Sequence, residues 1–341
     1  MRGLILAGGS GTRLRPFTNT SAKQLLPVAN VPIIEYAIRG MASAGISEIS
    51  IIVGHTAEQV KAALGSGEQF GVRITYVMQD APLGLAHCVS IAEESLNSEP
   101  FIMFLGDNML KDSLIGFAES LNRLIQVDGA CLLAVKEVTN PSAFGVATIN
   151  TSGQVLKVEE KPDRPQSNLA LVGVYGFSSD IFKAVRDIEP SARGELEITD
   201  AIQLLLQQSA RVETYDFRGW WFDTGNLESW LACNSAVLED LELTDSAAMK
   251  LDGSFVSTKA SVSEGVKLTN CYIGDGVSIG PNCQLENITI RNSIVLRDCV
   301  LTGPGIIQNS AIGAQSHMTL ENDVIIEGSF GDNSNFIGRL Q

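Results

Sequence analysis

The sequence predicts an α/β domain with a mixed, mostly parallel sheet, followed by a parallel β-helix. Up to about residue 241, short aliphatic runs alternate with helical patterns, which is the order of elements in an α/β domain. After about residue 245 the helical patterns cease, turns become frequent and aliphatic residues recur every six positions. Because 341 residues are more than one small core needs, we assign residues 1–242 to the α/β domain and residues 243–341 to the β-helix.

The α/β prediction depends on the spacing of apolar residues. Strands are expected at residues 3–7, 49–53, 74–78, 101–105 and 131–135. The helix after the first loop has an apolar face, which would cover the sheet, at Ile34, Ala37, Ile38 and Met41. Residues 145–149 and 154–159 have the pattern of a hairpin around Ser152 and Gly153, so the sheet is expected to be mixed.

The β-helix prediction depends on a period of six residues. The unbroken series is Ile294, Val300, Ile306, Ile312, Met318 and Val324, and a second set is Ile273, Ile279 and Leu285. Each flat side of a triangular coil takes one inward aliphatic per six residues, and neighbouring coils bury these side chains together. The gap between Leu285 and Ile294 indicates imperfect coils. A glycine-rich β-sandwich, the alternative, does not explain so long a series.

Composition excludes several classes of partner and site. A net charge of −15 and a pI near 4.6 argue against a nucleic-acid or anionic-membrane partner, because both require a basic face. Six cysteines without a CxxC pair and only three histidines indicate neither a zinc site nor a disulfide framework, so we expect buried, reduced thiols. The sequence has no signal-peptide pattern and no apolar run of the ~18 residues that span a bilayer, so we expect a cytoplasmic protein.

The amino-terminal loop is the first candidate for a functional site. An aliphatic strand ends at Ala7 and opens directly into Gly8, Gly9 and Gly11, whose backbone can turn its NH groups toward an anion. Arg13 and Arg15 follow, and arginine offers a fixed fork of donors to phosphate oxygens. The loop satisfies neither the GxGxxG nor the GxxxxGK[ST] pattern. The alternative is a tight strand-to-helix turn with its arginines in solvent.

Further charged residues lie where an anionic substrate would need them. Lys23, shortly after the loop, and Lys161, at the end of the hairpin, are candidate cations for phosphates, although each could also be a solvated lysine. Asp107 and Asp223 both follow apolar segments. In open sheets, ligands bind at the carboxyl ends of the strands. Two such carboxylates could hold Mg²⁺ between substrate phosphates, whereas one alone could be a cap or turn residue.

Candidates for binding a base come from one segment, YVMQDAPLGLAHC. The amide of Gln79 can donate to and accept from a pyrimidine edge, and Gly84 allows a planar ring to approach the backbone. His87 lies among small and apolar residues of the following helix, so we interpret it as a packing residue and give it no role.

Together these motifs resemble those of the glucose-1-phosphate thymidylyltransferases. The matching segments, in order, are AGGSGTRLRP, AKQLLPV, QDAPLGLAH, LGDN, FGV, VEEKP, RGELEITD and WFDTG. With the β-helix, the chain resembles the long form of that family. The resemblance implies a Rossmann-like nucleotidyltransferase domain, a left-handed β-helix, and formation of dTDP-glucose and pyrophosphate from dTTP and α-D-glucose 1-phosphate, the first step of dTDP-deoxysugar biosynthesis.

The same resemblance implies roles for individual residues. The nucleotide would be lined by Gly8, Gly9, Gly11, Thr12 and Gly84, with the base addressed by Gln24 and Gln79. Arg13 would stabilise the leaving pyrophosphate, Lys23 would hold the triphosphate, and Asp107 and Asp223 would hold Mg²⁺. The sugar phosphate would be bound by Lys161 and Arg193, and the glucose hydroxyls by Asn108, Gly145, Glu160 and Leu171.

The sequence departs from the family at two places and leaves alternatives open. Ser21 and Ala22 precede Lys23 where many relatives have proline, and a β-helix replaces the short form's helical carboxyl terminus, so that form's allosteric site is not carried over. The nearest alternative is a uridylyltransferase or an enzyme of amino-sugar phosphates, although Leu85 differs from the LGTAH pattern of acetylglucosamine-phosphate uridylyltransferases. An added acyltransferase activity would depend on His317.

A different class is a non-catalytic regulatory subunit that retains the fold. Such a subunit is expected to lose metal or phosphate ligands, whereas this chain keeps Arg13, Lys23, Asp107, Lys161 and Asp223. We therefore expect an active enzyme. The β-helix is expected to serve self-association into a homo-oligomer, since exposed coils offer flat surfaces.

Overall fold

The computed structural model describes residues 1–151, 153–241 and 253–339. The chain forms two compact units. One, the sheet unit, consists of Met1–Gly9 and Ile34–Trp221, and the other, the coil unit, consists of Ser10–Ile33 and Phe222–Gln341. The predicted boundary at residues 242–243 lies outside the described residues. Each unit is considered by itself below.

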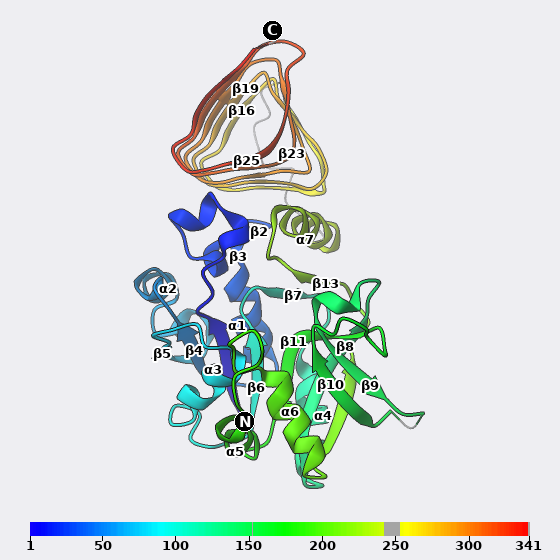
Figure 1. Ribbon diagram of the computed structural model, residues 1–341. Helices are drawn as coiled ribbons and strands as arrows, with labels where there is room; N and C mark the ends of the chain where they lie inside the picture. The colour runs from blue at the N-terminus through cyan, green and yellow to red at the C-terminus, as the bar shows by residue number, and fades with distance from the viewer. Residues whose placement is uncertain (152, 242–252, 340–341) are drawn as a thin grey trace. The chain divides into compact units, whose positions relative to one another are not determined.

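The sheet unit contains a nine-stranded mixed sheet, as the sequence predicts (Figure 1). Its strand order is β10-β9-β11-β6-β1-β4-β5, and β8 joins β11 to β12. The strands are β1 (Arg2–Ala7), β4 (Glu48–Val53), β5 (Arg73–Met78), β6 (Phe101–Leu105), β8 (Gly129–Glu137), β9 (Gly145–Ile149), β10 (Val155–Glu160), β11 (Leu169–Phe177) and β12 (Arg211–Asp216). Strands β1, β4, β5 and β6 pair in parallel, whereas β11 runs antiparallel to β6, β8 and β9.

The expected hairpin is present, because β9 and β10 pair antiparallel from Gly145↔Glu160 to Ile149↔Val155. Ser152, in the predicted turn, lies outside the described residues. The short strand β7 (Asn108–Leu110) follows β6, and at β13 (Trp221–Asp223) the chain passes from the sheet unit to the coil unit.

Helices connect the strands of the sheet unit. They are α1 (Ile33–Ser43), α2 (Ala57–Leu64), α3 (Leu85–Ala92), α4 (Ile115–Ile125), α5 (Ile181–Asp187) and α6 (Ile198–Gln207), with short 3-10 turns at Glu68–Phe70 and Pro141–Ala143. The predicted apolar face of α1 is confirmed by the burial of Ile34, Ala37, Ile38 and Met41. Helix α1 is followed by Gly45 at φ +80°, a conformation that glycine adopts without strain.

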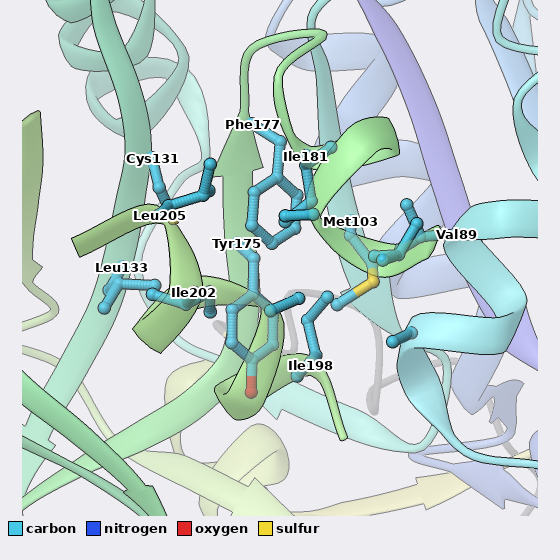
Figure 2. Close-up of a cluster of buried hydrophobic side chains, with 14 of the residues drawn as sticks. Val89, Met103, Cys131, Leu133, Tyr175, Phe177, Ile181, Ile198, Ile202 and Leu205 are labelled. Atoms are coloured by element: carbon cyan, nitrogen blue, oxygen red, sulfur yellow. The ribbon is translucent and has the colours of Figure 1, made fainter. Parts of the chain in front are cut away.

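The core of the sheet unit supports the elements that carry several candidate site residues. Figure 2 shows Tyr175 and Phe177 of β11 among apolar side chains of neighbouring elements, including Ile198 and Ile202 of α6. The rings of Tyr175 and Phe177 stack with centroids 6.0 Å apart, and both side chains are buried. This packing fixes β11, which carries Leu171. It also fixes the start of α6, which follows Arg193 in the sequence.

The coil unit begins with a segment of short turns instead of long elements. It contains the 3-10 turns η1 (Thr12–Leu14), η2 (Phe17–Asn19) and η3 (Lys23–Leu25), then a hairpin of β2 (Pro27–Val28) and β3 (Val31–Pro32). The two hairpin residues Ala29 and Asn30 have φ of +48° and +66°, as a tight turn of this length requires. Helix α7 (Leu227–Asp240) belongs to the same unit and is capped by Asn226, whose side chain accepts from Ser229 N at 2.9 Å.

The remainder of the coil unit is a parallel β-helix, which Figure 1 shows as a stack of triangular coils. Its strands are β14 (Phe255–Val256), β15 (Ala260–Val262), β16 (Lys267–Thr269), β17 (Tyr272–Ile273), β18 (Val277–Ile279), β19 (Gln284–Glu286), β20 (Thr289–Arg291), β21 (Ile294–Val295), β22 (Val300–Thr302), β23 (Ile306–Ile312), β24 (His317–Leu320), β25 (Ile325–Phe330) and β26 (Asn335–Gly338). Parallel pairing of Tyr272 with Thr289 and of Thr289 with Ile306 gives coils of 17 residues.

The predicted six-residue series is confirmed at most positions and is wrong by one residue at two. Ile273, Ile279, Leu285, Ile294, Ile312, Met318 and Val324 are buried. Val300 and Ile306 are only partly buried, and the following Leu301 and Ile307 are the fully buried residues. The coils differ in length, since Leu285 pairs with Leu301, Leu301 with Met318 and Met318 with Phe336, at separations of 16, 17 and 18 residues. The inward position therefore shifts along the sequence. Ile290, fully buried, fills the predicted gap.

Two further expectations from composition can be compared with the fold. All six cysteines are buried free thiols, as predicted. Among the residues that the structure describes, no helix is both long and apolar enough to cross a membrane.

Candidate active site

The end of β1 and the end of β5 meet at Gly8 and Gln79. A Cβ atom on Gly8 would lie 2.8 Å from Gln79 Oε1, so a glycine is needed for the amide to take this place. Gln79 Nε2 lies 3.2 Å from His87 Nδ1 and donates to it when that nitrogen is unprotonated. His87, to which the sequence assigned only packing, therefore orients the side chain that is predicted to address the base. Gly9, beside Gly8, is exposed.

Glycine is required at position 84 for a structural reason that the sequence did not reveal. Its φ is +106°, and a Cβ atom there would collide with the backbone of Leu196. Leu196 N donates to Leu83 O at 2.8 Å, and Ala86 N donates to Leu196 O at 3.0 Å. The glycine thus allows the strand-like segment that follows Arg193 to join the start of α3. A contact between Gly84 and a base remains a prediction.

Asp107 and Asn108 follow β6 at the carboxyl end of the sheet. Asn108 is buried, with Nδ2 donating to Asp107 Oδ1 at 2.9 Å and Oδ1 accepting from Trp221 Nε1 at 2.7 Å. Opposite lies an irregularity in β11 where Gly173 has φ +76°, and a Cβ atom there would lie 2.8 Å from Asn108 Oδ1. These contacts hold Asn108 in one orientation, and through it they position the half-buried carboxylate of Asp107. Trp221 was not singled out from the sequence.

The predicted ligands of the sugar phosphate gather around one carboxylate. Glu160 Oε1 lies 3.7 Å from Lys161 Nζ and 3.4 Å from Arg193 Nη1. Arg193 Nη1 also lies 3.3 Å from Glu197 Oε1, and the Glu197 side chain is only 5% exposed. Burial raises the pKa of Glu197, with a smaller contribution from the charge of Glu160, while Arg193 opposes the shift. The structure therefore brings Glu160, Lys161 and Arg193 together and adds Glu197.

Gly145 forms the wall beside this cluster. A Cβ atom on Gly145 would lie 3.0 Å from Leu171 Cδ1, 3.1 Å from Thr199 Cγ2 and 3.2 Å from Glu160 Oε2. Three residues predicted to bind glucose are thus neighbours. Thr199 was missed, although it lies within the RGELEITD motif. Its hydroxyl is buried and makes no hydrogen bond with any residue that the structure describes.

In the coil unit, the turns place the predicted phosphate ligands close together. Gly11 has φ +61°, its carbonyl accepts from Thr18 Oγ1 at 2.8 Å, and a Cβ atom on it would lie 3.0 Å from Lys23 Cβ. The loop therefore packs directly against the backbone end of Lys23. Thr12 and Arg15 are exposed.

Arg13 and Lys23 share the carboxylate of Asp223. Arg13 Nη2 lies 3.8 Å from Asp223 Oδ2, and Lys23 Nζ lies 3.9 Å from Asp223 Oδ1. The Lys23 side chain is 6% exposed, whereas that of Arg13 is 68% exposed. A Cβ atom on Gly225 would lie 2.6 Å from Arg13 Nη2, so this glycine leaves room for the guanidinium. Lys23 is therefore a buried cation, and Arg13 is an exposed one.

Gln24 lies beside Lys23 in η3 and is buried. Its Oε1 atom accepts no hydrogen bond from the described part of the chain. A buried amide oxygen without a partner is costly unless a ligand or water satisfies it, so Gln24 is suited to bind a polar group.

The candidate residues are divided between the two units. The sheet unit holds Gly8, Gly9, Gln79, Gly84, Asp107, Asn108, Gly145, Glu160, Lys161, Leu171 and Arg193, and the coil unit holds Gly11, Thr12, Arg13, Lys23, Gln24 and Asp223. The pairing of Asp107 with Asp223 around one metal ion joins residues of different units and remains a prediction.

The donor set fits Mg²⁺ better than a metal held by the protein alone. Among the described residues, no three His, Cys, Asp or Glu side chains form a group that could hold a metal ion. Mg²⁺ is a hard ion that takes one or two carboxylates and completes its shell with substrate phosphates and water. Asp107 and Asp223 are carboxylates of this kind.

An α/β sheet with a glycine-rich loop after its first strand, together with cations gathered around carboxylates, is suited to an enzyme with phosphorylated substrates. Residues 2–240 match the family described as nucleotidyl transferase. The chain belongs to this family.

The similar proteins extend this assignment. The chain is 42% identical to the glucose-1-phosphate thymidylyltransferase of Streptomyces antibioticus, with 94% of each chain covered. It is 40% identical to the low-salt glycan biosynthesis nucleotidyltransferase Agl11 of Haloferax volcanii, with 98% of this chain and 99% of the relative covered. A crystal structure of a glucose-1-phosphate thymidylyltransferase from Bacillus anthracis in complex with a sucrose is similar with a TM-score of 0.65 and 35% identity, over 71% of this chain and 96% of the other.

Proposed function

We propose that the protein is a glucose-1-phosphate thymidylyltransferase, which converts dTTP and α-D-glucose 1-phosphate to dTDP-glucose and pyrophosphate. The observation that carries the proposal is that the candidate cations gather in pairs, each pair around one carboxylate. Arg13 and Lys23 lie within 4 Å of Asp223, and Lys161 and Arg193 lie within 4 Å of Glu160. Because both substrates of the reaction are phosphates, each pair of cations can serve one of them.

In the proposed reaction, a phosphate oxygen of glucose 1-phosphate attacks the α-phosphorus of dTTP. A new P–O bond forms, the bond between the α-phosphorus and the oxygen bridging to the β-phosphorus breaks, and pyrophosphate leaves with that electron pair. The attacking phosphate is already an anion, so no general base and no covalent nucleophile on the protein are required. What the protein must supply is alignment of the two substrates and neutralisation of charge.

Each cation has a distinct task in this reaction. Lys161 and Arg193 hold the sugar phosphate, and Lys23 holds the triphosphate as a point charge. Arg13, which is exposed, stabilises the pyrophosphate as its charge grows. Mg²⁺, held by Asp107 and Asp223, supplies further neutralisation of the triphosphate when bound. Carboxylates that already hold the cations fix their positions before substrate arrives, which lowers the cost of ordering them.

Recognition of the thymine and of the glucose is assigned to amides, backbone groups and the carboxylate of Glu160. Gln24 and Gln79 address the thymine, since each amide offers a donor and an acceptor to a pyrimidine edge. The backbone of Gly8, Gly9, Gly11, Thr12 and Gly84 lines the nucleotide. Asn108, Gly145, Glu160 and Leu171 bind the glucose, with Asn108 and Glu160 as the polar partners of its hydroxyls.

We further propose a cytoplasmic homo-oligomer without nucleic-acid or membrane partners. Acyl transfer at His317 is not part of the proposal, because the family match and the motifs concern residues 2–240 only.

The test measures pyrophosphate release from dTTP, UTP, ATP, CTP and GTP, each combined with glucose, glucosamine and galactose 1-phosphates. The expected result is the highest kcat/KM for dTTP with glucose 1-phosphate. No release with any pair would contradict an enzymatic role, and preference for UTP or for glucosamine 1-phosphate would replace the proposed activity with the corresponding alternative.

A further inference from the structure

The segment that carries Lys23 and Gln24 is tied to the β-helix on its amino-terminal side. Thr20 Oγ1 donates to Asp332 Oδ2 at 2.6 Å, although the two residues are 312 positions apart. The other oxygen of this carboxylate, Oδ1, accepts from Ala314 N at 2.7 Å, which fixes the carboxylate on the coil. Pro16 also packs here, since a Cβ atom on Gly331 would lie 3.0 Å from Pro16 Cβ. Residues just before Lys23 are therefore held by the Gly331–Asp332 turn.

The carboxyl-terminal side of the same segment is held by Asn234 of α7. This side chain is fully buried, and its Oδ1 accepts from Ala29 N at 2.8 Å and from Ser278 Oγ at 2.7 Å. Its Nδ2 donates to Gly276 O at 2.9 Å. One amide thus joins the β2–β3 hairpin, α7 and a coil of the β-helix. Next to it, Asn30 Nδ2 donates to Ser261 Oγ at 2.9 Å.

Between these two points the segment does not pack closely on the coils. A cavity of about 320 Å³ lies there, lined on one side by residues such as Ser21 and Leu25 and on the other by Val295 and Arg297. Trp230 of α7 gives support at one further place, donating from Nε1 to Pro27 O at 2.8 Å. Ala22, Lys23, Gln24 and Leu26 are buried, so packing also holds the segment. Where the cavity leaves the segment without packing against the coils, the hydrogen bonds at its ends fix it to the β-helix.

We propose that Asp332 and Asn234 are positioning residues for Lys23 and Gln24, so that the β-helix takes part in nucleotide binding. This inference rests on the proposed function, in which Lys23 and Gln24 hold dTTP. The turn η3 has only three residues, so contacts with the rest of the chain contribute to its position, and the hydrogen bonds of Asp332 and Asn234 join its segment to the β-helix. When the hydrogen bonds of Asp332 or Asn234 are removed, part of the free energy of dTTP binding is spent on ordering the turn. Binding of the sugar phosphate at Glu160, Lys161 and Arg193 carries no such cost.

The test compares Thr20→Val, which removes the hydroxyl at nearly constant volume, with Thr20→Ser, which retains it. Thr20→Val is expected to raise KM for dTTP about threefold to tenfold, while KM for glucose 1-phosphate stays within about twofold. Thr20→Ser is expected to keep the wild-type values. The matched control is Thr302→Val, which removes a hydroxyl that lies 3.1 Å from Thr319 Oγ1 within the β-helix.

A double-mutant cycle isolates the pair, because Thr20 Oγ1 also lies 3.2 Å from Phe17 O. Asp332→Ala is expected to raise KM for dTTP, and adding Thr20→Val to it is expected to cause little further change. Hydrogen exchange of the peptide covering residues 20–33 supplies a readout independent of activity, with faster exchange expected in Thr20→Val and Asn234→Leu but not in Thr302→Val.

The outcomes separate the two claims. If the wild type releases no pyrophosphate with any substrate pair, the proposed function fails. If the wild type is active and Thr20→Val matches Thr302→Val in both KM values and in exchange, the positioning role is wrong. An equal rise in both KM values would also contradict it, because that result indicates general destabilisation. Should Asn234→Leu fail to fold, the Thr20 and Asp332 variants still decide.

Discussion

The two clusters of candidate cations are built in different ways. Lys161 follows the end of β10 and Arg193 precedes α6, so regular elements packed on the core hold their backbones. Arg13 and Lys23 lie in 3-10 turns of a segment that is held instead by α7 and the β-helix, through contacts such as Phe17 with Trp230 and Thr20 with Asp332. The distances between cation and carboxylate overlap, because Lys161 and Arg193 lie 3.7 Å and 3.4 Å from Glu160, and Arg13 and Lys23 lie 3.8 Å and 3.9 Å from Asp223, so the clusters differ in the elements that carry the cations. A site made of turns depends on distant anchors, and a site at strand ends depends on the sheet.

The largest expected effect concerns the cluster in the turns. Lys23→Met removes the charge of a buried side chain while keeping much of its volume, and the expected loss of kcat/KM for dTTP is on the order of a hundredfold. Steady-state kinetics with each substrate varied measures it. Lys267→Met, at an exposed position on the β-helix, is the control and should retain wild-type kinetics. Less than about a twofold loss in Lys23→Met would remove Lys23 from the site.

Asp107→Asn and Asp223→Asn test the proposed metal ligands, with one residue from each unit. Each variant is expected to lose activity by roughly tenfold to a hundredfold and to require more Mg²⁺ for half-maximal rate, because one of two carboxylates remains. Titration of the rate with MgCl₂ at saturating substrates measures this. Asp298→Asn on the β-helix serves as the control. A wild-type Mg²⁺ dependence in either variant would exclude that residue as a ligand.

Gly145→Ala should distinguish the sugar side from the nucleotide side. The added methyl would lie 3.0–3.2 Å from Leu171, Thr199 and Glu160, so it occupies space at the predicted glucose site. We expect KM for glucose 1-phosphate to rise by about tenfold or less, the cost of a modest steric change, with KM for dTTP unchanged. Gly153→Ala, at the turn of the same hairpin, meets no atom within 4 Å but strains a backbone with φ +82°, so it shows the effect of destabilising the hairpin without filling the site. A rise only in KM for dTTP would place Gly145 at the nucleotide instead.

The smallest expected effect is a pH dependence of stability from Glu197. Burial raises the folded-state pKa of this carboxyl above its ordinary value of about 4.3. At a pH between the ordinary pKa of the unfolded state and the raised pKa of the folded state, the folded protein binds the proton of Glu197 more tightly. The free energy of unfolding therefore falls as the pH rises from the first value to the second. Urea denaturation of wild type and Glu197→Gln over that pH range measures it, and the variant should have a weaker slope. Equal slopes would mean that Glu197 is not the group responsible.

Much of the fold follows from the sequence because periodicity reflects burial. The strands of the sheet unit, the apolar face of α1 and the six-residue repeat of the β-helix all appear where an alternation of apolar residues requires them. The exact inward residues at Val300 and Ile306 were wrong because the length of a coil, which varies from 16 to 19 residues, is set by how its corners close and not by the local pattern.

The candidate site was less predictable where contacts join distant parts of the chain. Motifs identified the cations and carboxylates, but nothing in the sequence near Gln79 indicates that His87 holds its amide. The anchors Thr20–Asp332 and Ala29–Asn234 span 312 and 205 positions, and no local pattern marks either pair. Gly84 was assigned to a base for its lack of a side chain, whereas the fold already requires that glycine for the approach of Leu196.

The proposed activity can be tested most directly by competition. Wild-type enzyme is given equimolar dTTP and UTP with α-D-glucose 1-phosphate and Mg²⁺, and the sugar nucleotides formed are separated and identified by mass spectrometry. We expect dTDP-glucose as the main product, released together with an equal amount of pyrophosphate. UDP-glucose as the main product, or no sugar nucleotide at all, would contradict the assignment.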